Sequence, residues 1–176
     1  MTDLAQGSYE LTNYLLDTGH KNIVMISGYV ELVLSAERLR GFKRAHEEHG
    51  LEVRADQIIE AEPDYNGGRE AFDRIIKREK PDAIMTVNDI VSMGVLTRAR
   101  EMGLRVPEDL SVAGYDDLLY SSMLETSLTT VRQPIKEMSA AAVDMIFKAA
   151  EGETVDNKLV MFKPQLFIRS STKNRL

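Results

Sequence analysis

The sequence predicts an α/β fold in which a doubly wound, mostly parallel sheet is covered by helices on both faces. Short apolar runs alternate along the chain with longer segments of helical periodicity. This alternation is typical of strand–helix–strand units joined by right-handed crossovers. The chain of 176 residues is 43% hydrophobic and 28% charged, which is enough to bury one substantial core.

The first half of the chain shows both patterns clearly. The run Ile23–Ile26 has no polar residue, as expected for a strand buried on both faces of a parallel sheet. Leu11, Tyr14 and Leu15 recur at helical spacing. We expect a helix over 9–17, a strand over 23–27, a helix capped by Ser35 and ending at Gly50, a strand over 57–61 and a helix over 66–80.

The second half continues the alternation and then departs from it. We expect a strand over 82–87, a helix capped by Asp89 and running through Met102, and a strand over 110–114. Beyond Asp116 we expect a strand over 128–132, a helix over 134–150, and short β-like segments over 159–162 and 165–168. The helix over 134–150 carries an apolar stripe that includes Ile135, Met145 and Ile146.

Charge and composition exclude several classes of protein. Asp and Glu number 28 against 22 Lys and Arg, a net charge of −6, whereas phosphate contact needs a basic face. The absence of cysteine excludes disulfides, thiolate zinc sites and cysteine nucleophiles. The first 20 residues contain no Lys or Arg, and no apolar run reaches the ~18 residues of a membrane span. We therefore expect a soluble, cytoplasmic protein without membrane contact.

Polar and aromatic side chains follow each predicted parallel strand. Arg38 lies in the helix after the first strand, Tyr65 follows the second, Asn88 the third and Asp116 the fourth. Ligands of open parallel sheets bind beyond the carboxyl ends of the strands. Because carboxylate, amide and guanidinium groups bind hydroxyls, this pattern predicts a hydroxyl-rich ligand. The alternative is that such residues only cap helices and form turns, which is the favoured interpretation for Asp89.

Motifs that indicate catalysis are absent from the sequence. It has no G-x-G-x-x-G, no Walker-type phosphate loop and no G-x-S-x-G nucleophile elbow. His46 and His49 are three positions apart, whereas the zinc motif H-E-x-x-H places its histidines four apart, so we expect a solvated helix face. His20 stands at a helix-to-strand junction and is expected to be structural. We expect neither an enzyme nor a metal or cofactor site.

Several segments resemble, in order, the signatures of one protein family. The signatures are GH-x-x-I, R-x-x-GF, ND-x-x-A-x-G, G-x-x-VP-x-D-x-S-x-x-G-[FY]-D, LTT-V-x-QP and x-R-x-ST. The matching segments are 19–23, 38–42, 88–94, 103–117, 128–134 and 168–172. Over nearly its whole length the chain therefore resembles the lactose/galactose repressor family of bacterial transcription regulators.

The resemblance implies a periplasmic-binding-protein-like effector domain, with a sugar or related small molecule held between two α/β lobes. By motif position it assigns effector hydrogen bonds to Arg38, Asn88 and Asp116. A structural ion pair is the alternative for Arg38. Where the family often has an aromatic contact, this chain has Pro63, with Tyr65 two residues on.

The resemblance also implies a division of the chain and a set of partners. Residues 1–127 correspond to the C-terminal lobe, 128–156 to a return segment of the other lobe, and 157–176 to strands that close the first. DNA contact and a helix-turn-helix would lie outside this chain, and a homodimer is expected. The implied function is effector sensing within a transcription regulator. The alternative is the solute-binding component of a sugar transporter, which shares the fold.

Two apolar features are unusual for this family. Leu32, Val33 and Leu34 stand where members with polar effectors often carry Ser, Thr or Arg, which implies a bulkier or partly apolar ligand, or an altered pocket. The helix over 134–150 has an apolar face with no partner among the other predicted elements. Because large exposed apolar patches mark interfaces, we expect this helix to pack against another copy or to fold back onto the sheet edge.

Overall fold

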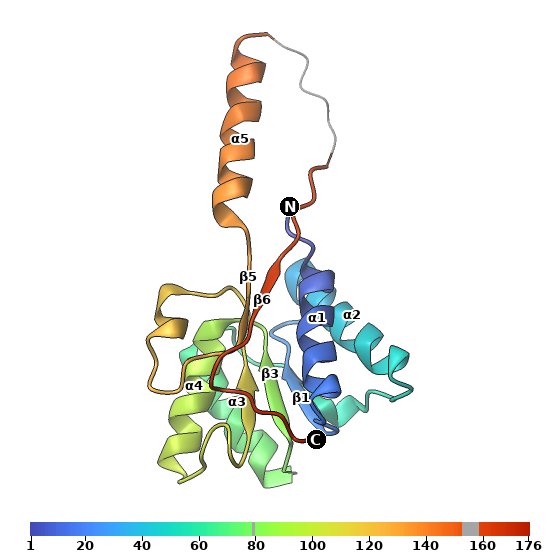
Figure 1. Ribbon diagram of the computed structural model, residues 1–176, viewed down its shortest axis with the longest axis vertical. Helices are drawn as coiled ribbons and strands as arrows, with labels where there is room; N and C mark the ends of the chain where they lie inside the picture. Colours follow the sequence, from blue (N-terminus) through green and yellow to red (C-terminus); the bar gives the residue numbers. More distant parts are fainter. Residues whose placement is uncertain (79, 153–158) are drawn as a thin grey trace.

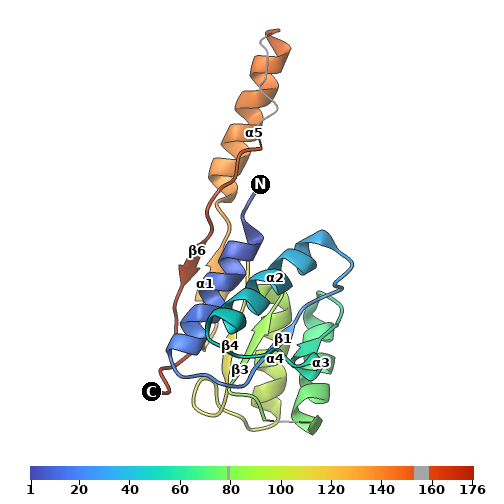
Figure 2. The same ribbon diagram turned by 90° about the vertical axis from the view of Figure 1, so that its right-hand side faces the viewer.

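The computed structural model describes residues 1–78, 80–152 and 159–176, which form a parallel sheet between two pairs of helices, with one long helix extending away from it (Figures 1 and 2). The sheet has the strand order β2-β1-β3-β4. Its elements and their connecting helices are α1 (Leu4–Asp17), β1 (Ile23–Ile26), α2 (Val33–Glu48), the 3-10 helix η1 (Ala55–Gln57), β2 (Ile58–Ile59), α3 (Tyr65–Arg78), β3 (Ala83–Thr86), α4 (Asp89–Glu101) and β4 (Ser111–Ala113). The predicted α/β class and parallel sheet are confirmed.

Both faces of the sheet are buried, as the all-apolar strands predict. In β1, Val24 and Ile26 belong to the core beneath α3 and α4, whereas Ile23 and Met25 belong to the core beneath α1 and α2. Alternate residues of a strand point to opposite faces, so a strand without polar positions can be covered on both sides. The helices thus form two layers around one sheet.

Two glycines allow the helices of each layer to pack closely. A Cβ on Gly41 of α2 would lie 2.1 Å from the carbonyl oxygen of Ala5 in α1. A Cβ on Gly94 of α4 would lie 2.1 Å from the carbonyl oxygen of Tyr65 in α3. A side chain at either position would push the two helices apart, so these glycines are required by packing.

The carboxyl ends of all four strands lie at one edge of the sheet because every pairing is parallel. β1 pairs with β2 on one side and with β3 on the other. The connection from β1 to β2 and the connection from β2 to β3 therefore run in opposite directions across the sheet, which places the topological switch point between β1 and β3. Ligand sites of such sheets occur at this switch point. The helices α2, α3 and α4 all begin at the same edge, and the four predicted site residues are distributed along it.

A second, antiparallel sheet joins β5 (Thr130–Arg132) to β6 (Gln165–Phe167). Parallel bridges connect it to the main sheet, from Ala113 to Thr129 and from Asp116 to Arg132. The 3-10 helix η2 (Leu119–Ser122) lies in the connection that precedes β5. The β-like segment expected over 159–162 forms an isolated bridge from Phe162 to Thr2 and no strand.

Helix α5 (Ile135–Ala150) projects from the end of the lobe (Figures 1 and 2). None of its residues is buried, and Ile135 and Ile146 are 56% and 68% exposed. The expectation that α5 folds back onto the sheet edge is therefore wrong. The physical reason is that α1 to α4 cover both faces of the sheet, and β5 already lies against its β4 edge through the bridge from Ala113 to Thr129. Packing against another copy stays a prediction.

Some element boundaries differ from expectation. α2 begins two residues before Ser35, so Ser35 lies within the first turn and is buried. The prediction that Ser35 is the N-cap of this helix is therefore wrong. The described residues do not include residue 79, which belongs to the helix predicted over 66–80. They also do not include residues 156 and 157, where a boundary of the chain's division was predicted. The division of the chain at 127 and 156 stays a prediction. Among the described residues, no helix is both long and apolar enough to cross a membrane.

Candidate functional site

An ion pair between Arg38 and Asp116 lies at the carboxyl edge of the sheet. Asp116 follows β4, and Arg38 lies in the second turn of α2. The Arg38 Nη2 atom is 3.1 Å from the Asp116 Oδ1 atom. The Arg38 side chain is 8% exposed, whereas that of Asp116 is 27% exposed. The carboxylate is therefore the half of the pair that a ligand can approach.

Two neighbours that the sequence did not single out complete this cluster. Gln133 Nε2 donates a hydrogen bond of 2.7 Å to Asp116 Oδ1. The Arg38 guanidinium lies 4.2 Å from the ring centroid of Tyr115, which is fully buried. Signals for both were present, because Gln133 belongs to the LTT-V-x-QP segment and Tyr115 directly precedes Asp116.

Hydrogen-bonding capacity remains at this cluster. Asp116 Oδ1 accepts from both Arg38 and Gln133, whereas Oδ2 accepts no hydrogen bond from any described residue. The buried Arg38 Nε also has no partner among the described residues. Burial raises the pKa of Asp116, and the charge of Arg38 and the hydrogen bond from Gln133 lower it in part. A ligand hydroxyl could donate to Oδ2.

The backbone around Asp116 is held in an uncommon conformation. Asp116 and Asp117 have φ values of 105° and 52°, which side-chain-bearing residues rarely adopt. Asp117 is anchored by Arg169, whose Nη2 lies 2.6 Å from its Oδ1, and by Arg132, whose Nε lies 2.6 Å from its Oδ2. Asp117 thus fixes the turn, and the turn directs Asp116 toward a hollow of about 690 Å³ that Gln133 also lines.

Asn88 follows β3 and caps α4. Its Oδ1 accepts from Val91 N at 2.8 Å, and its Nδ2 donates to Pro63 O at 2.9 Å. The expected cap at Asp89 is therefore wrong, because Asn88 occupies the N-cap position. Asn88 keeps one lone pair and one N–H group for further hydrogen bonds.

Asp89 instead joins three segments in the interior. Its carboxylate accepts hydrogen bonds from Leu118 N at 2.8 Å, Ser121 Oγ at 2.5 Å and Thr130 Oγ1 at 2.6 Å. The residue is fully buried. Burial raises the pKa of Asp89 from 3.8 to about 6, although the three donors oppose this shift. Asp89 thereby connects the start of α4 with η2 and with β5.

The structure does not bring Tyr65 to the Arg38–Asp116 pair. Tyr65 begins α3, after β2, whereas Asp116 follows β4 at the opposite side of the sheet. Three strand spacings of about 4.8 Å separate the ends of these strands by roughly 14 Å. Tyr65 is 37% exposed, and the Arg69 guanidinium lies 5.9 Å from its ring centroid.

The histidines have structural environments. His20 is buried, with Nδ1 2.8 Å from Leu15 O and Nε2 2.8 Å from Ser111 Oγ, which confirms a structural role. His46 is also buried, stacked 4.3 Å from the Phe42 ring, and burial lowers its pKa. The expected solvated face is therefore wrong at His46. Among the described residues, no group of His, Cys, Asp and Glu side chains could hold a metal ion.

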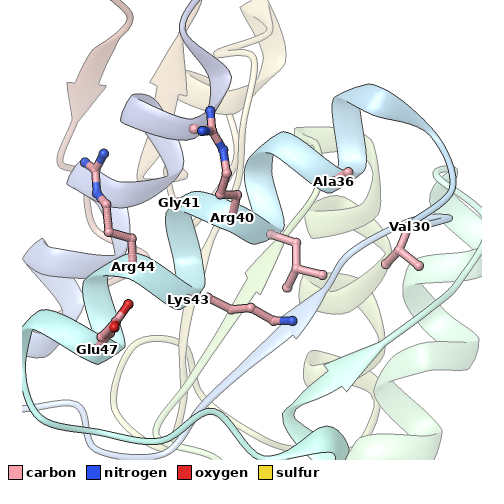
Figure 3. Close-up of a pocket in the computed structure, with 9 residues that line it drawn as sticks. Val30, Ala36, Arg40, Gly41, Lys43, Arg44 and Glu47 are labelled. Carbon is pink, nitrogen blue, oxygen red and sulfur yellow. The ribbon is translucent and has the colours of Figure 1, made fainter.

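A separate hollow of about 490 Å³ runs along the outer surface of α2 (Figure 3). Arg40 and Arg44 point to one side of it and Lys43 to the other. Arg40 pairs with Glu37, and Arg44 donates to a glutamine of α1 at 2.8 Å. The hollow contains none of the four predicted site residues.

Known proteins resemble this chain over most of its length. A family model described as the periplasmic binding protein-like domain matches residues 12–172. The chain belongs to this domain family. It is 37% identical over 173 residues to catabolite control protein A of Priestia megaterium and 33% identical over 174 residues to the HTH-type transcriptional repressor PurR of Aliivibrio fischeri (strain MJ11). Each match covers 97% of this chain and 52% of the relative, so the chain spans about half the length of these relatives.

Solved structures give the same result. A sugar-binding transcriptional regulator of the LacI family from Escherichia coli superposes with a TM-score of 0.91 at 26% identity, over 99% of this chain and 63% of that one. The transcriptional regulator CelR, solved as a cellobiose complex, superposes with a TM-score of 0.90 at 29% identity, over 97% and 52%. The resemblance to the lactose/galactose repressor (LacI) family is confirmed.

Proposed function

We propose that this chain is the effector-sensing part of a transcription regulator. The observation that carries the proposal is the buried Arg38 guanidinium paired with a half-open Asp116 carboxylate at the switch-point edge of the sheet. Two consecutive positive φ values at this turn support it, because such costly conformations cluster at functional sites. The relatives that are named as transcription regulators support this role, and the solute-binding component of a sugar transporter is the alternative.

The proposed effector is a hydroxyl-bearing, sugar-like small molecule. Asp116 Oδ2 accepts from a hydroxyl, and Asn88 supplies one further donor and acceptor. Arg38 orients Asp116 and adds positive charge. Tyr65 lies at the β2 end of the same sheet edge, away from the Arg38–Asp116 pair. Only a ligand long enough to extend along this edge from Asp116 contacts Tyr65. The cellobiose complex of CelR supports a carbohydrate for a protein of this family.

The proposed partners follow from this role. DNA is contacted through a helix-turn-helix outside this chain, which acts in the cytoplasm. The protein is a homodimer, and an apolar patch on η2 supports this, because Leu119, Tyr120 and Met123 are 70%, 61% and 69% exposed. α5 belongs with a second lobe, which completes the effector cleft.

Asp116→Asn tests the proposed effector site in the intact protein that carries this chain. Asparagine tolerates positive φ and keeps the shape of the side chain, so the turn is retained. Hydrogen bonds to charged groups contribute about 1.5–3 kcal/mol, so we expect the dissociation constant to rise by about 10- to 150-fold. Binding is measured by calorimetry against a panel of sugars and simple glycosides.

The matched control is Asp73→Asn, which also removes a paired carboxylate, since Asp73 Oδ1 lies 2.7 Å from Arg98 Nε between α3 and α4. This control should bind like the parent protein. Equal affinity of the parent and Asp116→Asn for every ligand in the panel, or no binding of any of them to the parent, would refute the proposed function.

A further inference from the structure

Two arginines hold the turn that carries Asp116. Asp117, the next residue of this turn, has a side chain that is only 3% exposed. Its Oδ1 accepts from Arg169 Nη2 at 2.6 Å, and its Oδ2 accepts from Arg132 Nε at 2.6 Å. Hydrogen bonds between charged groups are stronger than those between neutral groups, and here one reaches each oxygen. The Asp117 carboxylate is therefore fixed from two sides.

An aromatic ring of β6 holds both arginines in turn. The Arg132 guanidinium lies 3.8 Å from the ring centroid of Phe167, and the Arg169 guanidinium lies 5.5 Å from the same centroid. Planar guanidinium groups stack favourably on aromatic rings. Arg169 Nη1 also donates to Leu128 O at 2.7 Å. Arg132, Arg169 and Phe167 are called the clamp below, because together they hold Asp117 against the β5–β6 sheet.

The backbone of the turn needs this support. Asp116 and Asp117 have φ values of 105° and 52°, which are costly for residues with a side chain. Asp116 N donates to Val131 O at 2.8 Å, whereas Asp117 N makes only a longer contact of 3.3 Å to Thr130 Oγ1. Without the clamp, φ can relax toward negative values. Rotation about these bonds moves the Asp116 carboxylate relative to Arg38, so the geometry of the ion pair depends on the clamp.

We propose that Arg132 and Arg169 are positioning residues of the effector site, which set effector affinity by acting through Asp117. This inference rests on the proposed function of Asp116. Arg169 does not line the hollow that Asp116 faces, and its side chain is 15% exposed, so it acts on the effector only through Asp117. Arg132 lines that hollow and is 49% exposed, so its variants are also tested for direct ligand contact.

Arginine variants of the intact protein that carries this chain test the inference. A panel of monosaccharides and their methyl glycosides is titrated calorimetrically into each variant. For every ligand that binds the parent, Arg132→Gln and Arg169→Gln should raise the dissociation constant about tenfold. This change corresponds to about 1.4 kcal/mol, which is the scale of the strain at one residue with positive φ. Arg105→Gln is the matched control and should bind like the parent, because Arg105 also donates to both carboxylate oxygens of one aspartate, Asp109, at 3.1 Å each.

Two substitutions at Asp117 separate positioning from folding. Asp117→Gly and Asp117→Ala both remove the carboxylate that the arginines hold, but only glycine adopts positive φ without a steric cost. Asp117→Gly should therefore bind about 5- to 30-fold more tightly than Asp117→Ala. A purely structural role of the clamp predicts equal affinities and a lower urea midpoint alone. In the Asp117→Gly background, Arg132→Gln should cause no further loss, because its partner is already absent.

The other outcomes overturn the inference in distinguishable ways. If Asp116→Asn weakens binding but Arg132→Gln does not, the proposed function stands and the positioning role is refuted, even where Arg169→Gln fails to fold. If Arg132→Gln still weakens binding in the Asp117→Gly background, Arg132 contacts the ligand directly and its assignment is wrong. If no ligand of the panel binds the parent protein, both proposals are overturned.

Discussion

Replacing Asp89 with asparagine should remove a large part of the pH dependence of stability. Asp89 is fully buried, and its folded-state pKa of about 6 lies above the ordinary value of 3.8. The folded state therefore favours the neutral Asp89 carboxyl. The contribution of Asp89 to the free energy of unfolding is complete below pH 4 and is lost as the pH rises through 6. The pKa difference of about two corresponds to about 3 kcal/mol at 1.36 kcal/mol for each tenfold change in proton affinity.

Asparagine suits the site geometrically. Its Oδ1 can take the place of the oxygen that accepts from Leu118 N and Ser121 Oγ, and its Nδ2 can donate to Thr130, whose hydroxyl is free to rotate. The free energy of unfolding of the parent should therefore fall by about 2–2.5 kcal/mol more than that of Asp89→Asn between pH 4 and pH 7.

Urea denaturation at half-unit pH steps measures this difference. Asp56→Asn provides the control, because the Asp56 side chain is 57% exposed and its removal should leave the pH profile of the parent unchanged. Parallel profiles for the parent and Asp89→Asn across this range would refute the reasoning. They would show that the three donors stabilise the carboxylate as well as water does.

Two further substitutions test packing and assembly. Gly94→Ala places a methyl group against the Tyr65 carbonyl and should lower the free energy of unfolding by about 1–3 kcal/mol; an unchanged urea midpoint would mean that α3 and α4 can separate freely. Met123→Glu puts a charge into the exposed patch on η2 and should shift the intact protein toward monomer in light scattering. Met102→Glu, 46% exposed, is its control, and a persistent dimer in Met123→Glu would exclude this patch as the interface.

Capping shows where sequence reasoning about individual residues was limited. The dipeptide Asn88-Asp89 at the start of α4 was predicted to provide a cap at Asp89 and a ligand contact at Asn88, but Asn88 occupies the N-cap position and Asp89 is buried in the interior. Either residue satisfies the spacing, because both are good caps. The choice depends on Ser121 and Thr130, which reach Asp89 from distant parts of the chain and hold it in the interior.

The candidate site was predicted in part. Arg38 and Asp116 were placed at one edge because both follow parallel strands, and the structure joins them at 3.1 Å. Tyr65 follows the same rule but lies on the far side of the sheet, since the order β2-β1-β3-β4 separates it from β4. Strand order is set by long-range pairing, which local patterns do not report. Gln133 was overlooked because it reaches Asp116 from the crossover after β5.

The sequence alone determined the fold class, the α/β alternation, the burial of both sheet faces and the family. These properties follow from periodicity, composition and short motifs, each of which is encoded within a few tens of residues. Only the tertiary structure decided strand order, the partners of Asp89 and Asp116, and the projection of α5 from a sheet whose faces are already covered. Those features depend on which distant segments compete for the same surface, and that competition is settled by packing of the whole chain.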